Sequence, residues 1–171
     1  MDGSTLVSFV EMASVSNDGY IAEKVNRVLS EVRKGGYTYF AENDIIIAKI
    51  TPCMENGKCA IAMDLTNEIG FGSSEFHVFR CNNKVRPEFL FGYLNRSKIR
   101  NKAADSMTGA SGHRRVPIEF YENLEIPLPD SDKQNEIVAR VKEIENQIAI
   151  QEEKLKLIQN KTTEILNKYL Q

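Results

Sequence analysis

The chain has 171 residues, 42% of them hydrophobic and 27% charged, which fits one compact domain with an extension and excludes a multidomain machine or a disordered chain. Its 22 basic and 24 acidic residues give a formal net charge of -2, so the total charge gives no signal for a polyanionic partner. Any such partner must therefore meet a local patch.

The sequence predicts a cytoplasmic protein without membrane contact, because no run approaches the roughly 18 apolar residues of a membrane span and the first residues lack a signal-peptide pattern. Three cysteines, Cys53, Cys59 and Cys81, form no C-x-x-C pair. With His77 they would make four zinc ligands, but their spacings match no common zinc site. We expect reduced thiols, no metal and no cofactor.

Short strand-like runs fill most of the first 129 residues. Residues 44–50 are a β-branched run typical of a buried strand, and residues 58–63 are a plausible partner strand after an Asn-Gly turn. A third strand is predicted at residues 75–80, after a bend at residues 70–74. A helix is predicted next at residues 87–104.

The region after that helix begins with a flexible Gly-Ser loop at residues 107–112, and residues 116–128 return to the core. The composition changes near Pro129, since residues 130–171 contain no Gly and no Pro. Ser131 and Gln134 form a capping box that predicts the start of a long helix. Two units are therefore expected, residues 1–129 and 130–171.

The long helix carries an apolar stripe. Steps of four and three residues from Ile137 reach ten positions, eight of them apolar, as in a coiled coil. The eight predicted dimerisation residues are Ile137, Val141, Ile144, Ile148, Leu155, Ile158, Ile165 and Tyr169. A helix of this length spans about 60 Å and needs a partner helix to cover the stripe. The alternative is a single helix that folds back on its own domain.

Charge is uneven along the chain. Residues 96–115 contain six basic residues and one acidic residue, whereas the long helix is neutral. The basic window surrounds a loop whose glycines allow close backbone approach and whose Thr, Ser and His side chains can donate or accept hydrogen bonds. This combination suits duplex DNA. The alternative is a solvated helix face.

No catalytic motif stands out. The chain has no phosphate-binding loop, dinucleotide fingerprint or serine-hydrolase elbow. Asp130 and Glu152 imitate part of a metal-dependent nuclease signature, but on one helix they would lie about 30 Å apart and could not share a metal ion. We expect no enzymatic activity.

Five segments carry a family resemblance: residues 7–12, 40–58 (FAENDIIIAKITPCMENGK), 70–80 (GFGSSEFHVFR), 107–117 (MTGASGHRRVP) and 126–138 (IPLPDSDKQNEIV). In this order they resemble one class of target-recognition domain in the DNA specificity subunits of type I restriction-modification systems. The five segments are specific only together, and they cover most of the chain.

The resemblance implies a non-catalytic reader of double-stranded DNA, with a globular domain for one half-site and a long helix that pairs antiparallel with a second helix. It also implies methyltransferase subunits as partners, with restriction and translocating subunits where present. A full-length specificity subunit has two such halves. This chain resembles one half, so we expect a homodimer that reads a symmetric bipartite site, or a piece of a longer protein.

The predicted fold is α+β: a target-recognition domain with a mixed or antiparallel twisted sheet and flanking helices, followed by a long coiled-coil helix. The predicted DNA contacts are, first, Thr108, Ser111, His113, Arg114 and Arg115, and second, Lys49, Asn56, Lys58, Ser73 and Ser74. The second set flanks two turns that contain glycine, and some of its members could simply form those turns. Rival functions are a protein-interaction module, which the pI of about 5.8 slightly favours, and an endonuclease.

Overall fold

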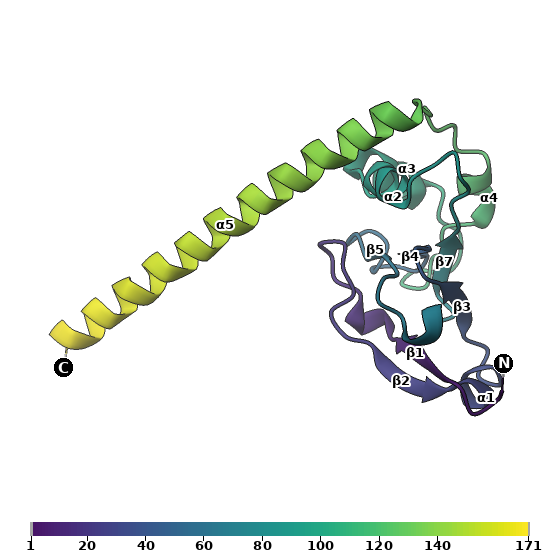
Figure 1. Ribbon diagram of the computed structural model, residues 1–171, viewed down its shortest axis with the longest axis horizontal. Coiled ribbons are helices and arrows are strands. Elements are labelled where there is room, and N and C mark those ends of the chain that lie inside the picture. The colour runs from purple at the N-terminus through teal and green to yellow at the C-terminus, as the bar shows by residue number, and fades with distance from the viewer. Residues whose placement is uncertain (1, 171) are drawn as a thin grey trace. The chain divides into compact units, whose positions relative to one another are not determined.

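Contacts within the chain divide it after Pro129 into two units, Met1–Pro129 and Asp130–Gln171. The structure is a computed structural model that describes residues 2–170 (Figure 1). Within this range, seven strands lie in the first unit, and the second unit is one helix. None of the described helices is long and apolar enough to cross a lipid bilayer.

The larger sheet has the strand order β2 (Val25–Val28), β1 (Leu6–Val10), β6 (Ile69–Gly72) and β3 (Thr38–Ala41). β1 and β6 run parallel, whereas β1 and β2 and also β3 and β6 run antiparallel. The short helix α1 (Leu29–Val32) packs on one face through both of its terminal residues. This sheet is therefore mixed.

The smaller sheet is antiparallel, with the order β5 (Cys59–Ile61), β4 (Ile45–Ala48) and β7 (Phe76–Phe79). These are the three strands predicted from the sequence, each shorter by one or two residues at either end. All four residues of β4 are buried, as expected for the central strand. The predicted α+β class is confirmed, and the strands form two sheets.

Alternation along β4 decides what each side of the smaller sheet contacts. Ile46 packs in a cluster with Val10 and Phe40 from the larger sheet. Ile45, on the opposite side, packs with Leu94 from the helices. One hydrophobic cluster is therefore shared by both sheets, and helices cover the other face of the smaller sheet.

The bend predicted at residues 70–74 is wrong for its first three residues, which belong to strand β6. A Cβ atom on Gly70 would lie 2.0 Å from the Phe40 ring, and one on Gly72 would lie 2.5 Å from the Val10 carbonyl oxygen. The glycines therefore allow β6 to fit between bulky neighbours rather than breaking it.

The single helix predicted before the Gly-Ser loop is also wrong, since the structure has two helices, α2 (Pro87–Leu94) and α3 (Ser97–Asp105). Arg96 between them is extended, with φ -61° and ψ 137°. Leu94 and Ala103 are both buried. In one continuous helix these two residues would point in opposite directions, so the break lets both reach the core. The shorter helical segments are η1 (Met12–Ser14), η2 (Thr66–Glu68) and α4 (Ile118–Glu122).

The second unit is the helix α5 (Ser131–Tyr169), which confirms the predicted long helix. Its N-cap is Asp130 rather than Ser131, which corrects the predicted capping box. Asp130 Oδ1 accepts a hydrogen bond from the Lys133 amide at 2.8 Å, and Gln134 is buried. A carboxylate suits this position because its negative charge faces the positive end of the helix dipole.

Gly72→Ala is expected to lower the free energy of unfolding by about 1–3 kcal/mol, because the new methyl group would overlap the Val10 carbonyl group. The matched control is Gly92→Ala on α2, where a Cβ atom meets nothing within 4 Å. Helix propensity makes that change neutral or stabilising by up to about 1 kcal/mol. Urea unfolding measures the free energy of unfolding of both variants. Equal values for Gly72→Ala and Gly92→Ala would contradict the close packing of Gly72 against the Val10 carbonyl group.

Candidate nucleic-acid interface

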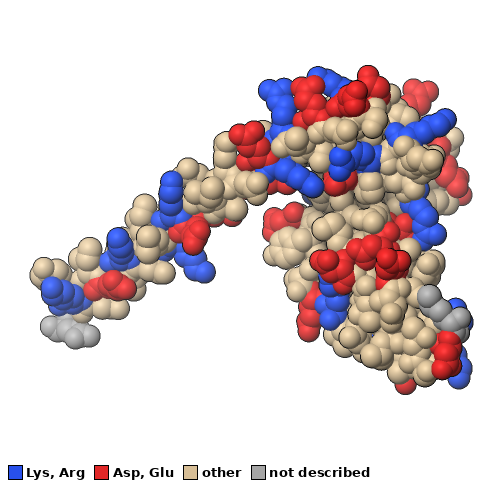
Figure 2. All heavy atoms as spheres, viewed as in Figure 1, with Lys and Arg blue, Asp and Glu red and all other residues tan. Residues whose placement is uncertain are grey.

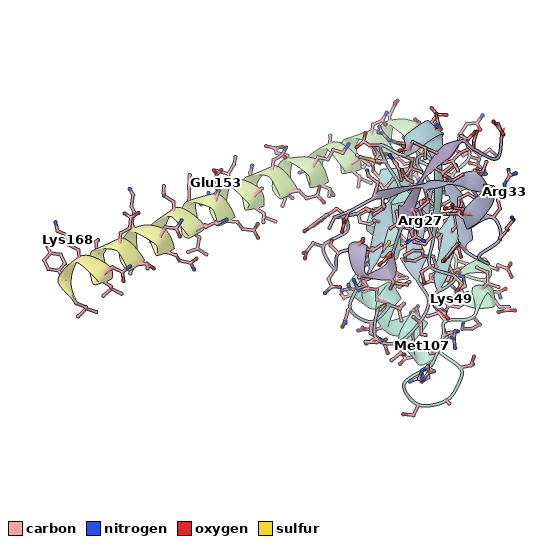
Figure 3. The ribbon with its side chains drawn as sticks, turned by 90° about the horizontal axis from the view of Figure 1, so that it is seen from below. Arg27, Arg33, Lys49, Met107, Glu153 and Lys168 are labelled. Carbon is pink, nitrogen blue, oxygen red and sulfur yellow. The ribbon has the colours of Figure 1, made fainter. Side chains whose placement is uncertain are left out.

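The chain from Met107 to Val116 forms a hairpin that is closed by a backbone pair. The Thr108 amide donates to the Arg115 carbonyl at 3.0 Å, and the Arg115 amide donates to the Thr108 carbonyl at 2.8 Å. Met107 and Val116 are buried, whereas residues 109–113 at the tip are exposed. Figure 3 shows this loop extending beyond Met107.

The base of the hairpin is fixed to the end of β4. The Thr51 amide donates to the Arg114 carbonyl at 2.9 Å, and the Val116 amide donates to the Lys49 carbonyl at 2.8 Å. The two buried ends of the hairpin pack in one cluster with Ala48. An exposed tip therefore stands on a base that the core holds in place.

The turn between β6 and β7 lies beside the same end of β4. The Lys49 amide donates to the Glu75 carbonyl at 2.9 Å. The Glu75 carboxylate accepts from Arg115 Nε at 2.9 Å and from Arg115 Nη2 at 2.6 Å. These contacts bring together a surface that we call the loop face, made by Lys49, Ser73, Ser74, Glu75, Thr108, Ser111, His113 and Arg115.

The ion pair between Glu75 and Arg115 places one negative and one positive charge in the loop face. The hydrogen bond from Arg115 holds the pKa of Glu75 below its ordinary value, and Glu75 raises the pKa of Arg115, so both groups are ionised at neutral pH. Burial lowers the pKa of His77, whose Nε2 donates to the Val116 carbonyl at 2.8 Å. Sequence reasoning missed Glu75, and its only signal was its place directly after two serines in a turn.

Two of the predicted contact residues bind backbone carbonyl groups of the protein itself. Arg114 Nη2 donates to the carbonyl groups of Ala104 and Met107 at 3.0 and 3.2 Å, at the end of α3. Lys58 Nζ donates to the Met12 carbonyl at 3.1 Å, at the start of η1. These contacts support the fold, and the predicted DNA contacts of both residues stay predictions.

The basic window at residues 96–115 does not form one patch. The Arg100 guanidinium group lies against Gly57. A Cβ atom added to Gly57 would be 1.9 Å from Arg100 Nη1. Asn56, in the same turn, is exposed and has no described contact with the loop face. Figure 2 shows acidic and basic side chains intermixed on the face in view. A separate groove is lined by both signs of charge, from Arg96, Lys98, Lys102, Glu119 and Glu125.

The cysteines do not gather with other metal ligands. Among residues 2–170, no three His, Cys, Asp or Glu side chains converge in a way that could hold a metal ion. Cys59 is buried, and Cys53 and Cys81 are half-buried. Burial raises the pKa of the Cys59 thiol, so it stays protonated and unreactive at neutral pH.

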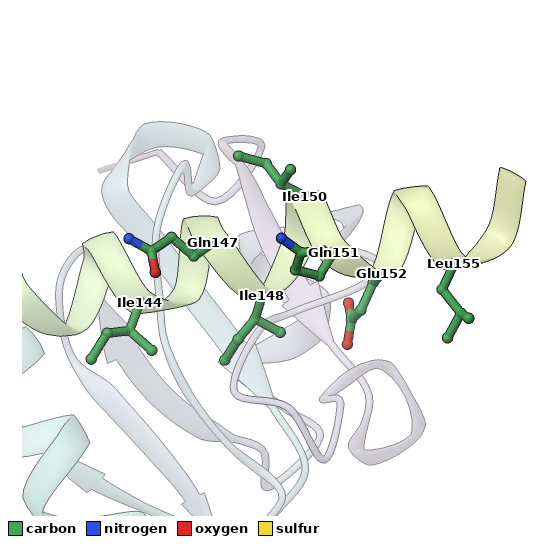
Figure 4. Close-up of a pocket in the computed structure, with 7 residues that line it drawn as sticks. All are labelled: Ile144, Gln147, Ile148, Ile150, Gln151, Glu152 and Leu155. Carbon is green, nitrogen blue, oxygen red and sulfur yellow. The ribbon is translucent and has the colours of Figure 1, made fainter. Parts of the chain in front are cut away.

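The predicted stripe is exposed along most of α5. Ile137 is half-buried, whereas the other seven residues of the stripe are 46–76% exposed. Figure 4 shows Ile144, Ile148 and Leu155 projecting from one side of the helix, where they line a shallow groove. The groove is lined by α5 residues alone, so it is a feature of the helix surface.

A family model described as a type I restriction modification DNA specificity domain matches residues 4–160. The specificity subunit of the type I restriction enzyme EcoAI from Escherichia coli is 38% identical over 142 residues. That match covers 81% of this chain and 24% of the relative. The EcoEI specificity subunit, also from Escherichia coli, is 36% identical over 140 residues, which cover 80% of this chain and 23% of the relative. The chain thus spans about a quarter of the length of these curated relatives.

Two solved structures share the fold. The HsdS subunit from Thermoanaerobacter tengcongensis has a TM-score of 0.73 at 26% identity, over 96% of this chain and 41% of that one. A chain from a structure described as the basis of complex assembly and conformational transition of the type I R-M system has a TM-score of 0.74 at 24% identity. The match covers 96% of this chain and 42% of that chain.

Arg114→Ala is expected to lower the free energy of unfolding by about 1–3 kcal/mol, because it leaves the two carbonyl groups at the end of α3 without their charged donor. The matched control is Ser111→Ala at the exposed tip, which should change the free energy by less than about 0.5 kcal/mol. Thermal or urea unfolding gives both values. An Arg114→Ala protein as stable as the control would show that these hydrogen bonds do not contribute to the stability of the fold.

Proposed function

Because the chain belongs to the family of type I restriction-modification DNA specificity domains, we propose that it reads DNA sequence for such a system and catalyses no reaction itself. In this proposal, residues 1–129 are the target-recognition domain and residues 130–171 are the dimerisation and spacer helix. The protein directs a partner adenine methyltransferase, and restriction and translocating subunits where present, to a bipartite target. The proposed location is the cytoplasm, where these partners would meet the DNA of the cell.

The observation that supports DNA reading best is the construction of the loop face. Reading base edges in the major groove requires a protruding element with hydrogen-bonding side chains on a fixed support. The hairpin has an exposed tip with Ser111 and His113, and its base is tied to β4 through Lys49 and Val116. Such a loop fits a groove better than a flat basic surface does.

We propose that the contacts to bases and phosphates come mainly from the residues of the loop face: Thr108, Ser111, His113, Arg115, Lys49, Ser73 and Ser74. Asn56 is proposed for a flanking contact because it is exposed. Arg114 and Lys58 are proposed for phosphate contacts only, since their described hydrogen bonds already hold them against backbone carbonyl groups. Phosphate contacts of this kind fix register without specifying sequence.

We also propose that a second copy of the chain covers the α5 stripe, so that two recognition domains read a symmetric bipartite site. Seven large apolar side chains are at least 46% exposed along this helix in one regular stripe. Isolated helices with such a stripe are stabilised by pairing, since pairing removes apolar surface from water. Gln151 and Thr162 interrupt the stripe, and polar residues at such positions fix the register of the pair.

Selection from a randomised duplex pool tests the reader function, with the protein alone and with the methyltransferase subunit of its own system. We expect a two-part motif with symmetric halves. Lys49→Ala should reduce the slope of log K against log salt by about 1 if Lys49 contacts a phosphate group, whereas Lys34→Ala, after α1, should leave the slope unchanged. Absence of any motif with the methyltransferase present would contradict DNA reading and favour a protein-interaction module.

Sedimentation of Ile158→Asp tests the pairing of α5. The side chain is 60% exposed in one copy and would be buried in the pair, so an unpaired carboxylate there should weaken dimerisation at least tenfold. The matched control is Asn160→Asp, two residues away and off the stripe, which adds the same charge and should leave the dimer intact. Equal dissociation of both variants, or a wild-type monomer at micromolar concentration, would contradict self-pairing.

A further inference from the structure

The Arg115 guanidinium group is only partly used by the protein. A guanidinium group has five N–H donors. In the described structure, Nε and one hydrogen of Nη2 are directed to Glu75, and one hydrogen of Nη1 is directed to the His113 carbonyl at 3.1 Å. Each of the two terminal nitrogens therefore keeps one N–H group that no described residue accepts.

The orientation of Arg115 is fixed by Glu75 and by the backbone. The backbone of Arg115 is paired with both Thr108 and Ile50, so the residue cannot move with the tip of the hairpin. The Glu75 carboxylate binds one edge of the guanidinium plane through two hydrogen bonds, which sets the direction of that plane. The Arg115 side chain is still 45% exposed, so the group remains open to a ligand.

Two terminal N–H groups of one arginine match the O6 and N7 acceptors of guanine in the major groove. A guanidinium group whose charge is balanced by a carboxylate is a poorer phosphate ligand than a free one, because the carboxylate repels the phosphate group. We infer that Glu75 is a specificity-determining residue, which holds Arg115 so that it reads a guanine edge rather than the DNA backbone. This inference rests on the proposed DNA-reading function.

A merely structural ion pair would behave differently. Exposed pairs of this kind contribute little to stability, so a structural role predicts that losing Glu75 changes binding to all sequences alike or not at all. A specificity role predicts a change at one base position in each half-site. The base preference of the selected motif therefore separates the two roles, whereas overall affinity does not.

The experiment is selection from a randomised duplex pool with the full chain and its methyltransferase subunit, for wild type, Glu75→Gln, Arg115→Lys and Glu31→Gln. Glu75→Gln removes the negative charge and one of the two oxygen atoms that accept hydrogen bonds from Arg115. Arg115→Lys keeps a cation but removes the planar fork. Glu31→Gln, on α1, makes the same change of net charge at an exposed residue outside the loop face. Circular dichroism confirms that each variant is folded.

We expect Glu75→Gln and Arg115→Lys to lose the guanine preference at the same position of each half-site, by roughly 5- to 100-fold, while the rest of the motif is kept. Binding of Glu75→Gln to random duplex should be equal to or stronger than that of wild type. Glu31→Gln should select the wild-type motif.

A Glu75→Gln protein that selects the unchanged wild-type motif would overturn the inference while leaving the proposed function intact. Loss of preference in Arg115→Lys alone would overturn it in the same way, since Arg115 would then read without help from Glu75. If wild type selects no motif, the proposed function fails first and the inference falls with it.

Discussion

The fold depends on one buried carboxylate, Asp44, at the junction of the two sheets. Its side chain is almost fully buried and accepts from the Ala41 amide at 2.7 Å and from Arg80 Nε and Nη2 at 2.8 and 2.7 Å. Its carbonyl also accepts from the Ala62 amide at 2.8 Å. A buried charge without partners costs several kcal/mol, so the three hydrogen bonds to the carboxylate are needed together. With the backbone contact to Ala62, they join the end of β3 to the start of β4, the end of β7 and the chain beyond β5.

This junction also positions the loop face, although it lies at the other end of the same strands. β4 and β7 are antiparallel, so fixing Asp44 against Arg80 at one end aligns Lys49 with Glu75 at the other. The hairpin then adds Arg115, whose ion pair with Glu75 links the third segment to the first two. Three segments that are remote in sequence thus meet because of the register of one strand pair.

The parts of the fold that follow from local patterns could be predicted from the sequence. The β-branched run of β4 and the apolar periodicity of α5 are such patterns, since their signals lie within the element itself. The glycines of β6 could not be interpreted locally, because the reason for them is the Phe40 ring in another strand. The break at Arg96 likewise reflects two separate parts of the core that the flanking helices must reach.

The same distinction applies to the candidate site. Exposure of Ser111 and His113 follows from the Gly-rich loop around them, so the sequence identified the tip of the hairpin. The role of Glu75 depends on Arg115, forty residues later in the chain, and the carbonyl contacts of Arg114 depend on where α3 ends. The sequence shows that the loop contains an arginine, but only the fold shows which acceptors within the protein already bind its guanidinium group.

The total charge of the chain is near neutral, and contacts within the protein also occupy three of the cations proposed to meet DNA. Arg115 is balanced by Glu75, and Arg114 and Lys58 are held by backbone carbonyl groups, so these three cations attract a phosphate group less freely than unpaired surface cations do. Under the proposed function, a DNA reader built this way gains little from non-specific electrostatic attraction, which supplies a large share of the affinity of many DNA-binding proteins. Its affinity would then come from base contacts, from the pairing of two half-sites through α5, and from phosphate contacts made by partner subunits. Under the same proposal, weak binding by the chain alone and selective binding in the complex would keep the subunit from holding its partners on the wrong DNA.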